Sequence, residues 1–586
     1  MLKPISAKNL FWVCYGLMCL LQLIAATQFP LFGDEAFYWL ESQYLAWSYT
    51  ELPGWTQWTI ALSQWLLPQS ELTVRLPSLL AAFSIPWLGM LISKQLRTPD
   101  LDLPHSPWLI GLLLLALPLL SLAGVLAIPD IWLSFFALLT TYTLVKADQT
   151  QQARWFLLLG LVLALGVNVH VRFWMLVGLA GVIYLWQCRH RKSIIRGLLG
   201  ISVPMMLLGF LPILWFNFQH DFPLLTFQFQ ERHPWTFQPS HAAFVLIQML
   251  VTTPLLFLLC VQLSFKHLAG QSFSTFIARL AVAHWLLYAV LGFVTDELRF
   301  NSHWVLSSYV LILLLVTSTP NLNRRWLAAC AGSGFLAAMA WLLTLLYWHH
   351  PSTAMTKLNA QFTENSRGWQ ALAAYTEEIK SAENLQPVTT DHFMNLAALE
   401  FYGDDDWQLK SLDHPMNSKH GRAKQLQLMQ LMRNSNEESQ LLVVEHSGMK
   451  LPQQIPFYQQ ACQSLNGLEW LDSLSLEQGL KVYYFFRSGT GQCQLPPIYY
   501  IEQQAGAVTG WLVHEKGSDT AVTLPSTNSI ATLKTGALGN SELFRTVDPN
   551  SYQLSEFSIS ADSEVKVDQL QFQVNGVQVE TLLWTD

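Results

Sequence analysis

Charged residues are scarce in this sequence. Asp, Glu, Lys and Arg make up 12% of its 586 residues, against roughly 25% in an average soluble protein. Such a shortage excludes an ordinary soluble chain and indicates a large membrane-embedded part. The formal net charge of −7 also excludes the basic footprint of a nucleic-acid-binding protein.

The few charges are unevenly distributed. Of the 33 Lys and Arg residues, 18 lie in residues 1–349 and 15 in the shorter segment 350–586. The first part is therefore predicted to be a membrane domain and the second a soluble region. Within the soluble region, composition and patterning predict an α/β domain over 350–490 and a β-rich module over 491–586.

Cysteine is rare outside the apolar segments. Of 7 cysteines, only Cys462 and Cys493 lie in the polar half. If that half occupies an oxidising compartment, the two predict a disulfide. Two free thiols are the alternative, because spacing alone does not define connectivity. The other five are expected to be inert packing residues.

Long apolar runs predict the membrane spans. A helix needs about 20 mostly apolar residues to cross the hydrocarbon core. The segment from Trp155 to Cys188 accommodates two spans only as a tight hairpin that turns near Asn168–Arg172. The predicted eleven spans are 10–29, 75–94, 107–126, 129–146, 155–170, 172–188, 195–216, 243–263, 277–296, 303–319 and 325–348.

Loop cations predict the orientation. With the N-terminus in the cytoplasm, 14 of the 18 cations before residue 350 fall in inside loops. Eleven spans then place residues 350–586 in the periplasm, outside a bacterial inner membrane. Although "LIAATQ" resembles a signal-cleavage site, the first apolar stretch is long for a signal peptide, so we expect an uncleaved anchor.

The four outside cations before residue 350 are all arginines that lie beside predicted span ends. Separate salt bridges are the simple explanation for any one of them. For all four together, a shared anionic ligand is the better explanation, because guanidinium groups bind phosphate bidentately. The arginines are Arg75, Arg172, Arg232 and Arg299. Their acidic neighbours are Glu71, Asp130, Glu231, Asp296 and Glu297.

A phosphate at the outer face indicates lipid-linked chemistry. No nucleotide-sugar pool exists outside the cytoplasm, so a transferase there needs a donor that arrives in the membrane. A sugar on a polyprenyl phosphate meets this need, and arginines would neutralise the charge that develops on the leaving phosphate. The acceptor hydroxyl also needs a base, a role that a carboxylate near the outer face can fill.

Asp34 is placed for that role, directly after the first predicted span. It stands with Glu35 at the start of "GDEAFYWLESQYLAW". The alternative is that both are helix-start acids favoured by the macrodipole. The outer loop 30–74 also carries many aromatic residues, which predict amphipathic helices in the membrane interface, with sugar stacking as the alternative. Its tryptophans are Trp39, Trp47, Trp55, Trp58 and Trp65.

Several further segments belong to the same pattern as this first outer loop. They follow one another along roughly residues 1–410. They are "SELTVRLPSLLAAF", "AIPDIWLSFFALLTTY", "LPILWFNFQHDFPLLTFQFQERH", "NSHWVLSSYVLILLL", "RGWQALAAY" and "NLAALEFYG". With the first outer loop, they resemble the GT-C glycosyltransferases of the protein O-mannosyltransferase-like group. The resemblance is to the branch named after rhizobial lipopolysaccharide core galacturonosyltransferases. This chain departs from the pattern at Ile128, which replaces Thr, and at Phe216, which separates the Trp and Asn of a Trp-Asn motif.

The resemblance implies a GT-C-like membrane domain and roles for acidic residues. Asp34 matches the first-loop base or acceptor-orienting group. Glu35 matches the next family position, whose role is less defined. Asp130 matches an Asp of the second outer loop that lies near the catalytic pocket in relatives. A cap at the start of a span, beside Pro129, is an equal alternative for Asp130.

The resemblance also implies where the donor binds. Arg172 falls where relatives carry a basic residue, often Lys, after a glycine-rich fifth span. His303 and Trp304 match the late His-Trp segment and are expected to contact donor phosphate or sugar. His170, two residues before Arg172, is a candidate to substitute for it or assist it, and a structural histidine at the membrane edge is the more common alternative. Tyr38 is the remaining predicted substrate-binding residue. Arg232, Arg75 and Arg299 are predicted phosphate ligands on the topological argument.

A metal is not predicted. Asp34, Glu35, Asp130 and His303 carry ligands suitable for a hard cation, but no compact ligand spacing supports a site, and relatives differ in metal use. No cofactor is expected, and a divalent metal stays open. The chain has no evident internal repeat, and its soluble half has no nucleophile or nucleotide motif.

Periodicity predicts the elements of the soluble region. Helices are expected over 368–382 and 418–435, and strands over 440–446 and 480–488. Residues 555–584 alternate polar and apolar residues, and Asn575-Gly576 predicts a hairpin turn. This region either helps to hold the acceptor or forms a stabilising lid without substrate contact.

The sequence thus predicts a multi-pass membrane glycosyltransferase that moves a sugar from a polyprenyl-phosphate donor to an extracytoplasmic acceptor. A glycolipid such as lipopolysaccharide core or lipid A is the first candidate acceptor, and protein is the second. A transporter or flippase of an anionic lipid-linked sugar is the main rival. That class usually shows charged or broken helices at mid-membrane and inverted repeats. An inactive envelope scaffold is the remaining alternative.

Overall fold

Helices fill the apolar runs of the chain, and strands occur only in its polar half, among the described residues. The structure is a computed structural model. It describes residues 6–96, 106–233, 235–295, 302–347, 365–404, 406–433, 440–477, 480–504, 507–524, 529–536, 538, 544, 547, 549–560, 571–574 and 577–579.

The chain divides into two compact units. The helical unit consists of Met1–Phe29, Tyr38–His350 and Lys419–Gly421. The α/β unit consists of Pro30–Phe37, Pro351–Ser418 and Arg422–Asp586. The short segment Pro30–Phe37 therefore belongs to the α/β unit, although it directly follows the first apolar helix. This assignment matters because Asp34 and Glu35 lie in that segment.

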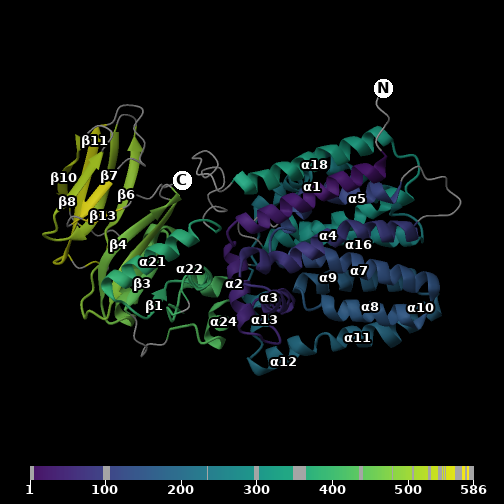
Figure 1. Cartoon of the computed structure of the whole chain (residues 1–586), viewed down its shortest axis with the longest axis horizontal. Helices are drawn as coiled ribbons and strands as arrows, with labels where there is room; N and C mark the ends of the chain where they lie inside the picture. Colours follow the sequence, from purple (N-terminus) through teal and green to yellow (C-terminus); the bar gives the residue numbers. More distant parts are fainter. Residues whose placement is uncertain are drawn as a thin grey trace. The chain divides into compact units, whose positions relative to one another are not determined.

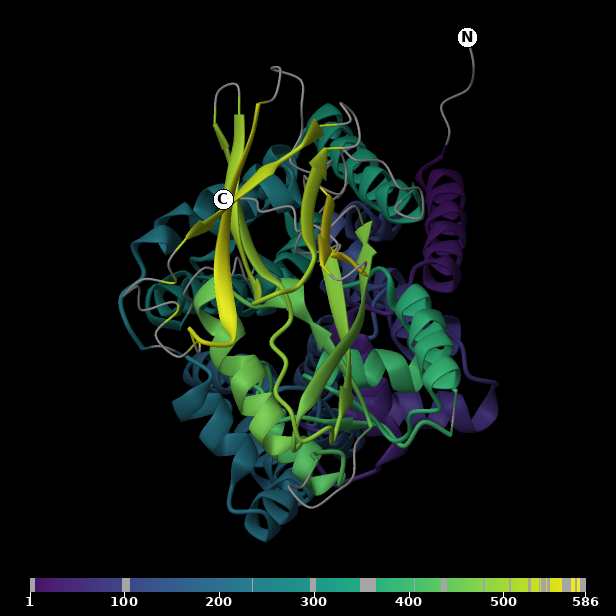
Figure 2. The same cartoon turned by 90° about the vertical axis from the view of Figure 1, so that its left-hand side faces the viewer.

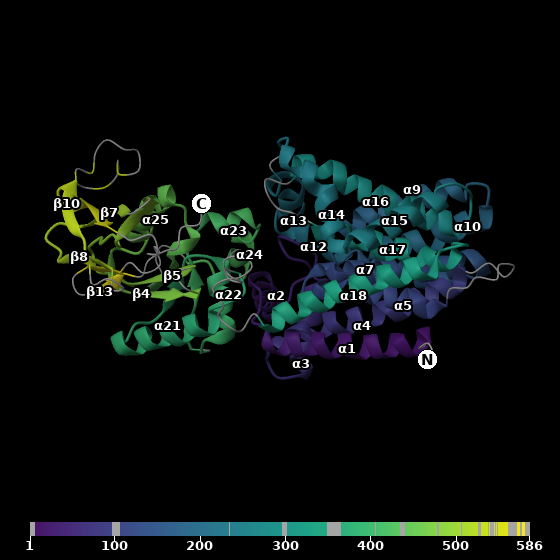
Figure 3. The same cartoon turned by 90° about the horizontal axis from the view of Figure 1, so that it is seen from above.

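Long helices lie side by side in the helical unit, as Figures 1 and 3 show for α1, α4, α5 and α18. The helices before residue 220 are α1 (Ala7–Gln28), α2 (Gly33–Gln43), whose first residues lie in the other unit, α3 (Trp55–Leu66), α4 (Glu71–Leu96), α5 (Pro107–Leu115), α6 (Pro118–Ala123), α7 (Pro129–Thr150), α8 (Ala153–Gly166), α9 (Val171–Gln187), α10 (Lys192–Gly197), η1 (Leu198–Ser202), α11 (Val203–Leu208) and α12 (Leu211–Gln219). The later ones are α13 (Pro223–Thr226), η2 (Phe227–Glu231), η3 (Pro239–Ala243), α14 (Phe244–Thr252), α15 (Pro254–His267), α16 (Phe273–Thr295), η4 (Ser302–Val305), α17 (Leu306–Leu313), η5 (Leu314–Ser318) and α18 (Arg324–Tyr347).

Four of the described helices, α1, α4, α16 and α18, are long and apolar enough to cross a membrane. Two bent helix pairs raise the number to six if each pair is one span. Helices α8 and α9 and the segment Ser302–Ser318 are apolar but shorter. The helical, membrane-like character of this region is confirmed, whereas the predicted number of eleven spans stays a prediction.

Proline and glycine account for the breaks inside the predicted spans. The run 107–126 divides before Pro118, which opens α6 because proline cannot continue the hydrogen-bond ladder of a helix. The run 243–263 divides at Thr253, which has φ +72°, and α14 and α15 meet there at 109°. At Gly209, after α11, a Cβ would lie 2.3 Å from the Ala164 backbone oxygen, so only glycine permits this close approach to α8.

The predicted turns and loop helices around the first spans are present. Residues 167–170 connect α8 to α9, which confirms the turn expected near Asn168–Arg172. The loop 30–74 contains the helices α2 and α3. Trp47 and Trp65 are 59% and 81% exposed, whereas Trp39 is buried. The two exposed side chains are therefore the ones placed to enter a membrane interface.

A five-stranded sheet forms the first part of the α/β unit, and Figure 2 shows it with its covering helices. The strand order is β2-β1-β3-β5-β4, parallel among the first three and antiparallel after them. The elements are α21 (Trp369–Glu383), β1 (Val388–Thr390), α22 (Phe393–Tyr402), β2 (Lys410–Ser411), α23 (Pro415–Lys419), α24 (Ala423–Leu428), β3 (Leu441–Glu445), η6 (His446–Gly448), α25 (Leu451–Ser464), β4 (Leu468–Leu476) and β5 (Lys481–Ser488).

Helices cover both faces of this sheet. Phe485 of β5 contacts Tyr375 of α21, with ring centroids 5.3 Å apart. The next residue of the strand, Phe486, points to the other face and contacts Tyr458 of α25 at 5.5 Å. The result is a three-layer α/β/α arrangement, as predicted for the start of the soluble region.

The predicted elements of this layer are mostly correct. The helix over 368–382 and the strands over 440–446 and 480–488 are confirmed. The single helix expected over 418–435 is wrong. The chain there forms the end of α23 and the whole of α24, two short helices separated by Gly421 with φ +73°. A left-handed residue interrupts any continuous helix.

The last part of the chain is β-rich, as predicted. It forms two antiparallel sheets, with orders β10-β11-β7-β6 and β13-β12-β8-β9. Leu512 and Phe557 of the first sheet share one buried core with Val522 and Val574 of the second. The predicted turn Asn575-Gly576 lies outside the described residues, but its flanking strands pair antiparallel. The strands are β6 (Ile498–Gln504), β7 (Ala507–Glu515), β8 (Thr520–Leu524), β9 (Ser529–Ile530), β10 (Thr532–Gly536), β11 (Tyr552–Ser560), β12 (Gln571–Val574) and β13 (Val577–Val579).

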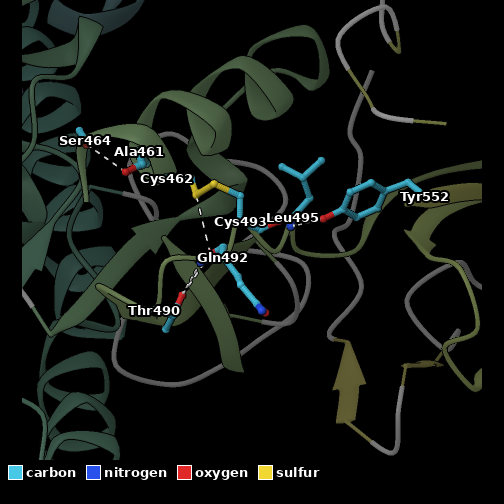
Figure 4. The surroundings of a disulfide bond; sticks show 8 residues. All are labelled: Ala461, Cys462, Ser464, Thr490, Gln492, Cys493, Leu495 and Tyr552. Atoms are coloured by element: carbon cyan, nitrogen blue, oxygen red, sulfur yellow. Dashed lines mark hydrogen bonds between the residues drawn. A yellow bond between two sulfur atoms is a disulfide. The ribbon is translucent and has the colours of Figure 1, made fainter. Parts of the chain in front are cut away.

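The two cysteines of the polar half form a disulfide (Figure 4). Cys462 comes from α25, and Cys493 lies in the connection between β5 and β6. Their Cα atoms are 5.7 Å apart. Nearby, the hydroxyl of Tyr552 accepts the N–H of Leu495 at 2.8 Å. The predicted pairing is confirmed, and it ties the connection between the α/β layers and the β-rich region to α25.

Candidate functional site

The predicted site residues are divided between the two units. Asp34 and Glu35 lie in the α/β unit. The other predicted residues that the structure describes lie in the helical unit. Arg299 lies outside the described residues, as do its possible partners Asp296 and Glu297.

The starts of α7 and α9 bring Asp130 and Arg172 together. Pro129 occupies the first turn of α7, where its missing N–H has no intrahelical partner to lose, and Asp130 follows it. His170 caps α9 because its Nδ1 accepts the N–H of Arg172 at 3.1 Å. The Arg172 guanidinium then donates to both oxygens of Asp130, at 2.7 and 3.2 Å.

This ion pair is buried, with only 10% of the Arg172 side chain and 5% of the Asp130 side chain exposed. The salt bridge that was the simpler expectation for Arg172 is therefore present. It leaves the Nε of Arg172 buried and without a hydrogen-bond partner among the described residues. A buried donor of this kind normally has a partner, so the guanidinium retains capacity for an anionic ligand.

Trp304 lies between two predicted phosphate ligands. The guanidinium carbon of Arg172 is 5.7 Å from the centroid of its ring, and that of Arg232 is 5.8 Å away. These distances suit cation–π contacts. Tyr288 packs against the same ring at 5.5 Å. The fold thus brings together side chains of four separate segments around one indole.

Two predicted histidines join this group with different exposure. His303 Nε2 lies 3.8 Å from Asp130 Oδ1, and its side chain is 39% exposed. His170 is 4% exposed and already caps α9. His303 is therefore the accessible histidine of the pair, and His170 has a structural task in addition to any contact with substrate. Tyr38 is buried and belongs to the same unit.

The position of Arg232 depends on the first outer loop. Its guanidinium donates to Gln228 Oε1 at 3.0 Å. The Gln228 amide in turn donates to the backbone oxygen of Glu51. The loop 30–74 therefore helps to orient a cation that comes from a segment more than 150 residues later.

Arg75 has a different environment from Arg172 and Arg232. Its guanidinium donates to the backbone oxygens of Ala26 and Phe29, at 3.2 and 2.5 Å, and the residue is fully buried. These carbonyls lie at the end of α1, where a cation satisfies both hydrogen bonding and the helix dipole. The contacts favour a structural task, and a phosphate-binding role for Arg75 stays a prediction.

In the α/β unit, Asp34 forms an ion pair that was not foreseen. Arg422 Nη2 lies 2.9 Å from Asp34 Oδ1. The guanidinium carbon lies 4.5 Å from the centroid of the Phe37 ring and 4.1 Å from that of the Phe393 ring, and these two rings pack edge to face against each other. No sequence signal indicated Arg422, because it stands 388 positions after Asp34 in a segment expected to be plain helix.

Glu35 contributes to the start of α2. Its Oε2 accepts the N–H of Phe32 at 2.9 Å, and the residue is fully buried. This contact resembles the return bond of a capping box. The geometry therefore favours the helix-start interpretation of Glu35, whereas Asp34 keeps 39% of its side chain exposed.

A metal site is not evident in the part of the chain that the structure describes, where no group of three or more His, Cys, Asp or Glu side chains has suitable geometry. The side chains around Trp304 and Asp130 supply guanidiniums held in place and an accessible imidazole. Such a group can bind a phosphate and stabilise negative charge that develops on it.

Comparisons with known proteins give a family match and two fold matches. A family model described as dolichyl-phosphate-mannose-protein mannosyltransferase matches residues 53–216. That segment contains Asp130, His170 and Arg172. A search of curated proteins found no match.

Two solved structures share the fold. The first is ArnT from Cupriavidus metallidurans in the apo state, with a TM-score of 0.59 and 13% identity. The second is the same protein bound to undecaprenyl phosphate, with a TM-score of 0.54 and 13% identity. Each match covers 82% of this chain and 98% of the other. With the family match, they confirm the resemblance to the GT-C superfamily, whereas the narrower branch stays a prediction.

Proposed function

We propose that this chain is a GT-C superfamily glycosyltransferase that transfers a sugar from a polyprenyl-phosphate donor to an acceptor outside the cytoplasm. The observation that carries the proposal is the group formed by Arg172, Arg232 and His303 around Trp304. The fold match to a protein that was solved with undecaprenyl phosphate supports the class of donor.

The transfer needs negative charge to be stabilised on the leaving group. The acceptor oxygen bonds to the anomeric carbon, and the bond from that carbon to the donor phosphate oxygen breaks. The electron pair stays on the polyprenyl phosphate, which gains one negative charge. Two guanidiniums held in place before the reaction stabilise that charge without reorganisation. Arg172 retains a buried donor for this purpose.

The acceptor hydroxyl must lose its proton as the new bond forms. Asp34 is the proposed base, because its side chain is partly exposed and it matches the first-loop Asp of the family. The proton passes from the acceptor oxygen to the carboxylate, which later returns it to water. Charge and atoms then balance without a metal or a redox cofactor.

We place the chain in a bacterial inner membrane, with the α/β unit in the periplasm. The distribution of loop cations and the disulfide Cys462–Cys493 support this orientation. A glycolipid such as lipopolysaccharide core or lipid A is the proposed acceptor. The likeness to ArnT does not indicate the acceptor, so this part of the proposal rests on the resemblance in the sequence.

Two measurements test the proposed function. The full chain in lipid nanodiscs is titrated with undecaprenyl phosphate, and Arg172→Ala and Arg232→Ala are expected to weaken binding at least tenfold. Envelope glycolipids of cells with and without the protein are then compared by mass. A sugar-sized mass difference on one glycolipid is expected. Unchanged binding in both variants would remove the phosphate site, and an unchanged glycolipid profile would remove the proposed acceptor.

A further inference from the structure

The segment that carries Asp34 is held by the α/β unit. The N–H of Leu31 donates to the hydroxyl of Tyr402 at 2.9 Å, and the indole N–H of Trp369 donates to the Leu31 oxygen at 3.1 Å. The N–H of Gly33 donates to the backbone oxygen of Asn365 at 2.7 Å. These contacts hold the chain immediately before α2 at several points.

Arg422 then defines the direction of the Asp34 side chain. The Arg422 side chain is only 2% exposed, whereas that of Asp34 is 39% exposed. A buried guanidinium that lies against the rings of Phe37 and Phe393 and is paired with Asp34 has little freedom to move. The carboxylate therefore has one oxygen at a fixed cation, while part of the group stays accessible.

The support for Arg422 extends to the central sheet. Asn417 accepts the N–H of Phe393 through its side chain at 2.9 Å and accepts the N–H of Arg422 through its backbone oxygen at 2.7 Å. Asn417 thus holds the backbone of both Phe393 and Arg422, whose guanidinium lies over the Phe393 ring. Phe393 opens α22, which directly follows Asp391 and His392 at the end of β1.

The end of β1 is itself rigidly bonded. Asp391 accepts the amide of Asn395 at 2.7 Å and the N–H of Glu445, on the neighbouring strand, at 2.8 Å. Asp391 and Asn395 are fully buried. A connected series of contacts therefore runs from the sheet through α22 to Arg422 and Asp34.

We propose that Arg422 is a positioning residue for Asp34 within the α/β unit. This inference rests on the proposed function, in which Asp34 is the base. It assigns the soluble region a task beyond that of a lid, because the catalytic carboxylate is oriented from within it. A carboxylate displaced by about 1 Å can lose two orders of magnitude in rate.

A double-mutant cycle tests the proposal. Arg422→Gln is expected to lower kcat by about 10- to 100-fold with little change in the affinity for undecaprenyl phosphate, because the phosphate ligands lie in the other unit. In an Asp34→Asn background, Arg422→Gln is expected to cause no further loss. If the effects of the two substitutions on kcat are fully additive, the proposal is overturned. In the Asp34→Asn background, Arg422 has no carboxylate left to position, so its loss should have no effect.

Chemical rescue and a matched control separate positioning from folding. Arg422→Ala is expected to regain activity with added methylguanidinium, which can lie against the two rings and pair with Asp34 as the arginine does, but not with methylammonium. The control is Arg487→Gln, which removes another arginine of the same unit, one paired with Glu383 and Glu469 on the surface. It is expected to leave kcat unchanged. An equal loss in Arg487→Gln, or no rescue by either cation, would contradict the proposal.

A measurement that does not depend on activity distinguishes a failure of the positioning role from a failure of the proposed function. Hydrogen exchange of the amides of residues 31–37 is expected to speed up in Arg422→Gln and to stay unchanged in Arg487→Gln. If the wild-type chain transfers no sugar but exchange responds as expected, the proposed function fails and Arg422 still orients Asp34. If exchange in Arg422→Gln equals that of the wild type, the positioning role is refuted.

Discussion

Arg172 and Asp130 form a bidentate ion pair between the starts of two helices, 42 residues apart in the chain. The side chains of both residues are buried. A buried pair contributes little net stability, but the loss of one partner leaves an uncompensated charge in a medium that solvates it poorly. This relationship makes the pair the first target for substitution in the helical unit.

Asp130→Ala is expected to lower the free energy of unfolding of the helical unit by about 3–5 kcal/mol. Thermal unfolding in detergent, followed by tryptophan fluorescence, measures it. Arg191→Gln is the control, because Arg191 pairs with Asp148 near the other end of α7 and its side chain is 45% exposed. Arg191→Gln is expected to lower the free energy of unfolding by less than about 1 kcal/mol. Equal losses in the free energy of unfolding for the two variants would contradict the inference that burial makes the Asp130–Arg172 pair costly to break.

Trp304→Ala is expected to weaken undecaprenyl phosphate binding about tenfold, whereas Trp304→Phe retains most of it. The indole ring contacts both Arg172 and Arg232, and a desolvated cation–π contact contributes about 2 kcal/mol. Titration of the full chain in nanodiscs measures the affinity. Trp341→Ala, at a tryptophan of α18 that is 44% exposed, is the control. Normal affinity of Trp304→Ala would remove this residue from the donor site.

Cys462→Ser combined with Cys493→Ser is expected to destabilise the α/β unit by about 3–4 kcal/mol, from the entropy of a closed loop of about 30 residues. The two cysteines are 31 positions apart. Thermal unfolding of the wild type with and without reductant gives the comparison, and Cys14→Ser is the control at a free cysteine. An intact mass that shows two free thiols in the untreated protein would contradict the disulfide.

Acid is expected to destabilise the α/β unit through two buried histidines. Burial lowers the pKa of His414 to about 4 and the pKa of His446 to about 3. Between about pH 6.5 and 4, the unfolded chain binds protons at these side chains that the folded chain does not, so stability falls as the pH drops. At pH 5, each histidine accounts for up to about 2 kcal/mol.

Unfolding between pH 5 and 8 measures this dependence. In His414→Gln, the free energy of unfolding is expected to fall less steeply as the pH drops below about 6.5. Above pH 7, it is expected to vary with pH as in the wild type. The exposed His190→Gln is the control. A slope equal to that of the wild type in His414→Gln would show that this histidine takes up its proton in the folded state.

Much of the architecture follows from patterns that are local in the chain. Apolar runs predicted where the helices lie, and alternation predicted the strands β3, β5 and β11. The number of spans was harder to predict, because proline and glycine divide several runs into bent pieces whose length depends on packing. The helix expected over 418–435 failed for a related reason. Gly421 adopts a left-handed conformation that periodicity does not indicate.

The site was predictable only in part. Topology and resemblance named Arg172, Asp130, His303 and Trp304, and the structure brings these residues together. They also named Arg75, whose guanidinium donates to two carbonyls at the end of α1. No local pattern indicates this contact, and a phosphate-binding role for Arg75 stays a prediction.

The sequence by itself determined the membrane character of the first half, the α/β and β-rich character of the second, and the kinds of side chain available for phosphate-linked sugar transfer. These properties depend on composition and short-range periodicity, which each segment carries independently. The tertiary structure alone decided the partners. Arg422 reaches Asp34 across 388 positions because α22 and α24 pack around Pro30–Phe37, and no local pattern encodes a contact that exists only after distant segments fold together.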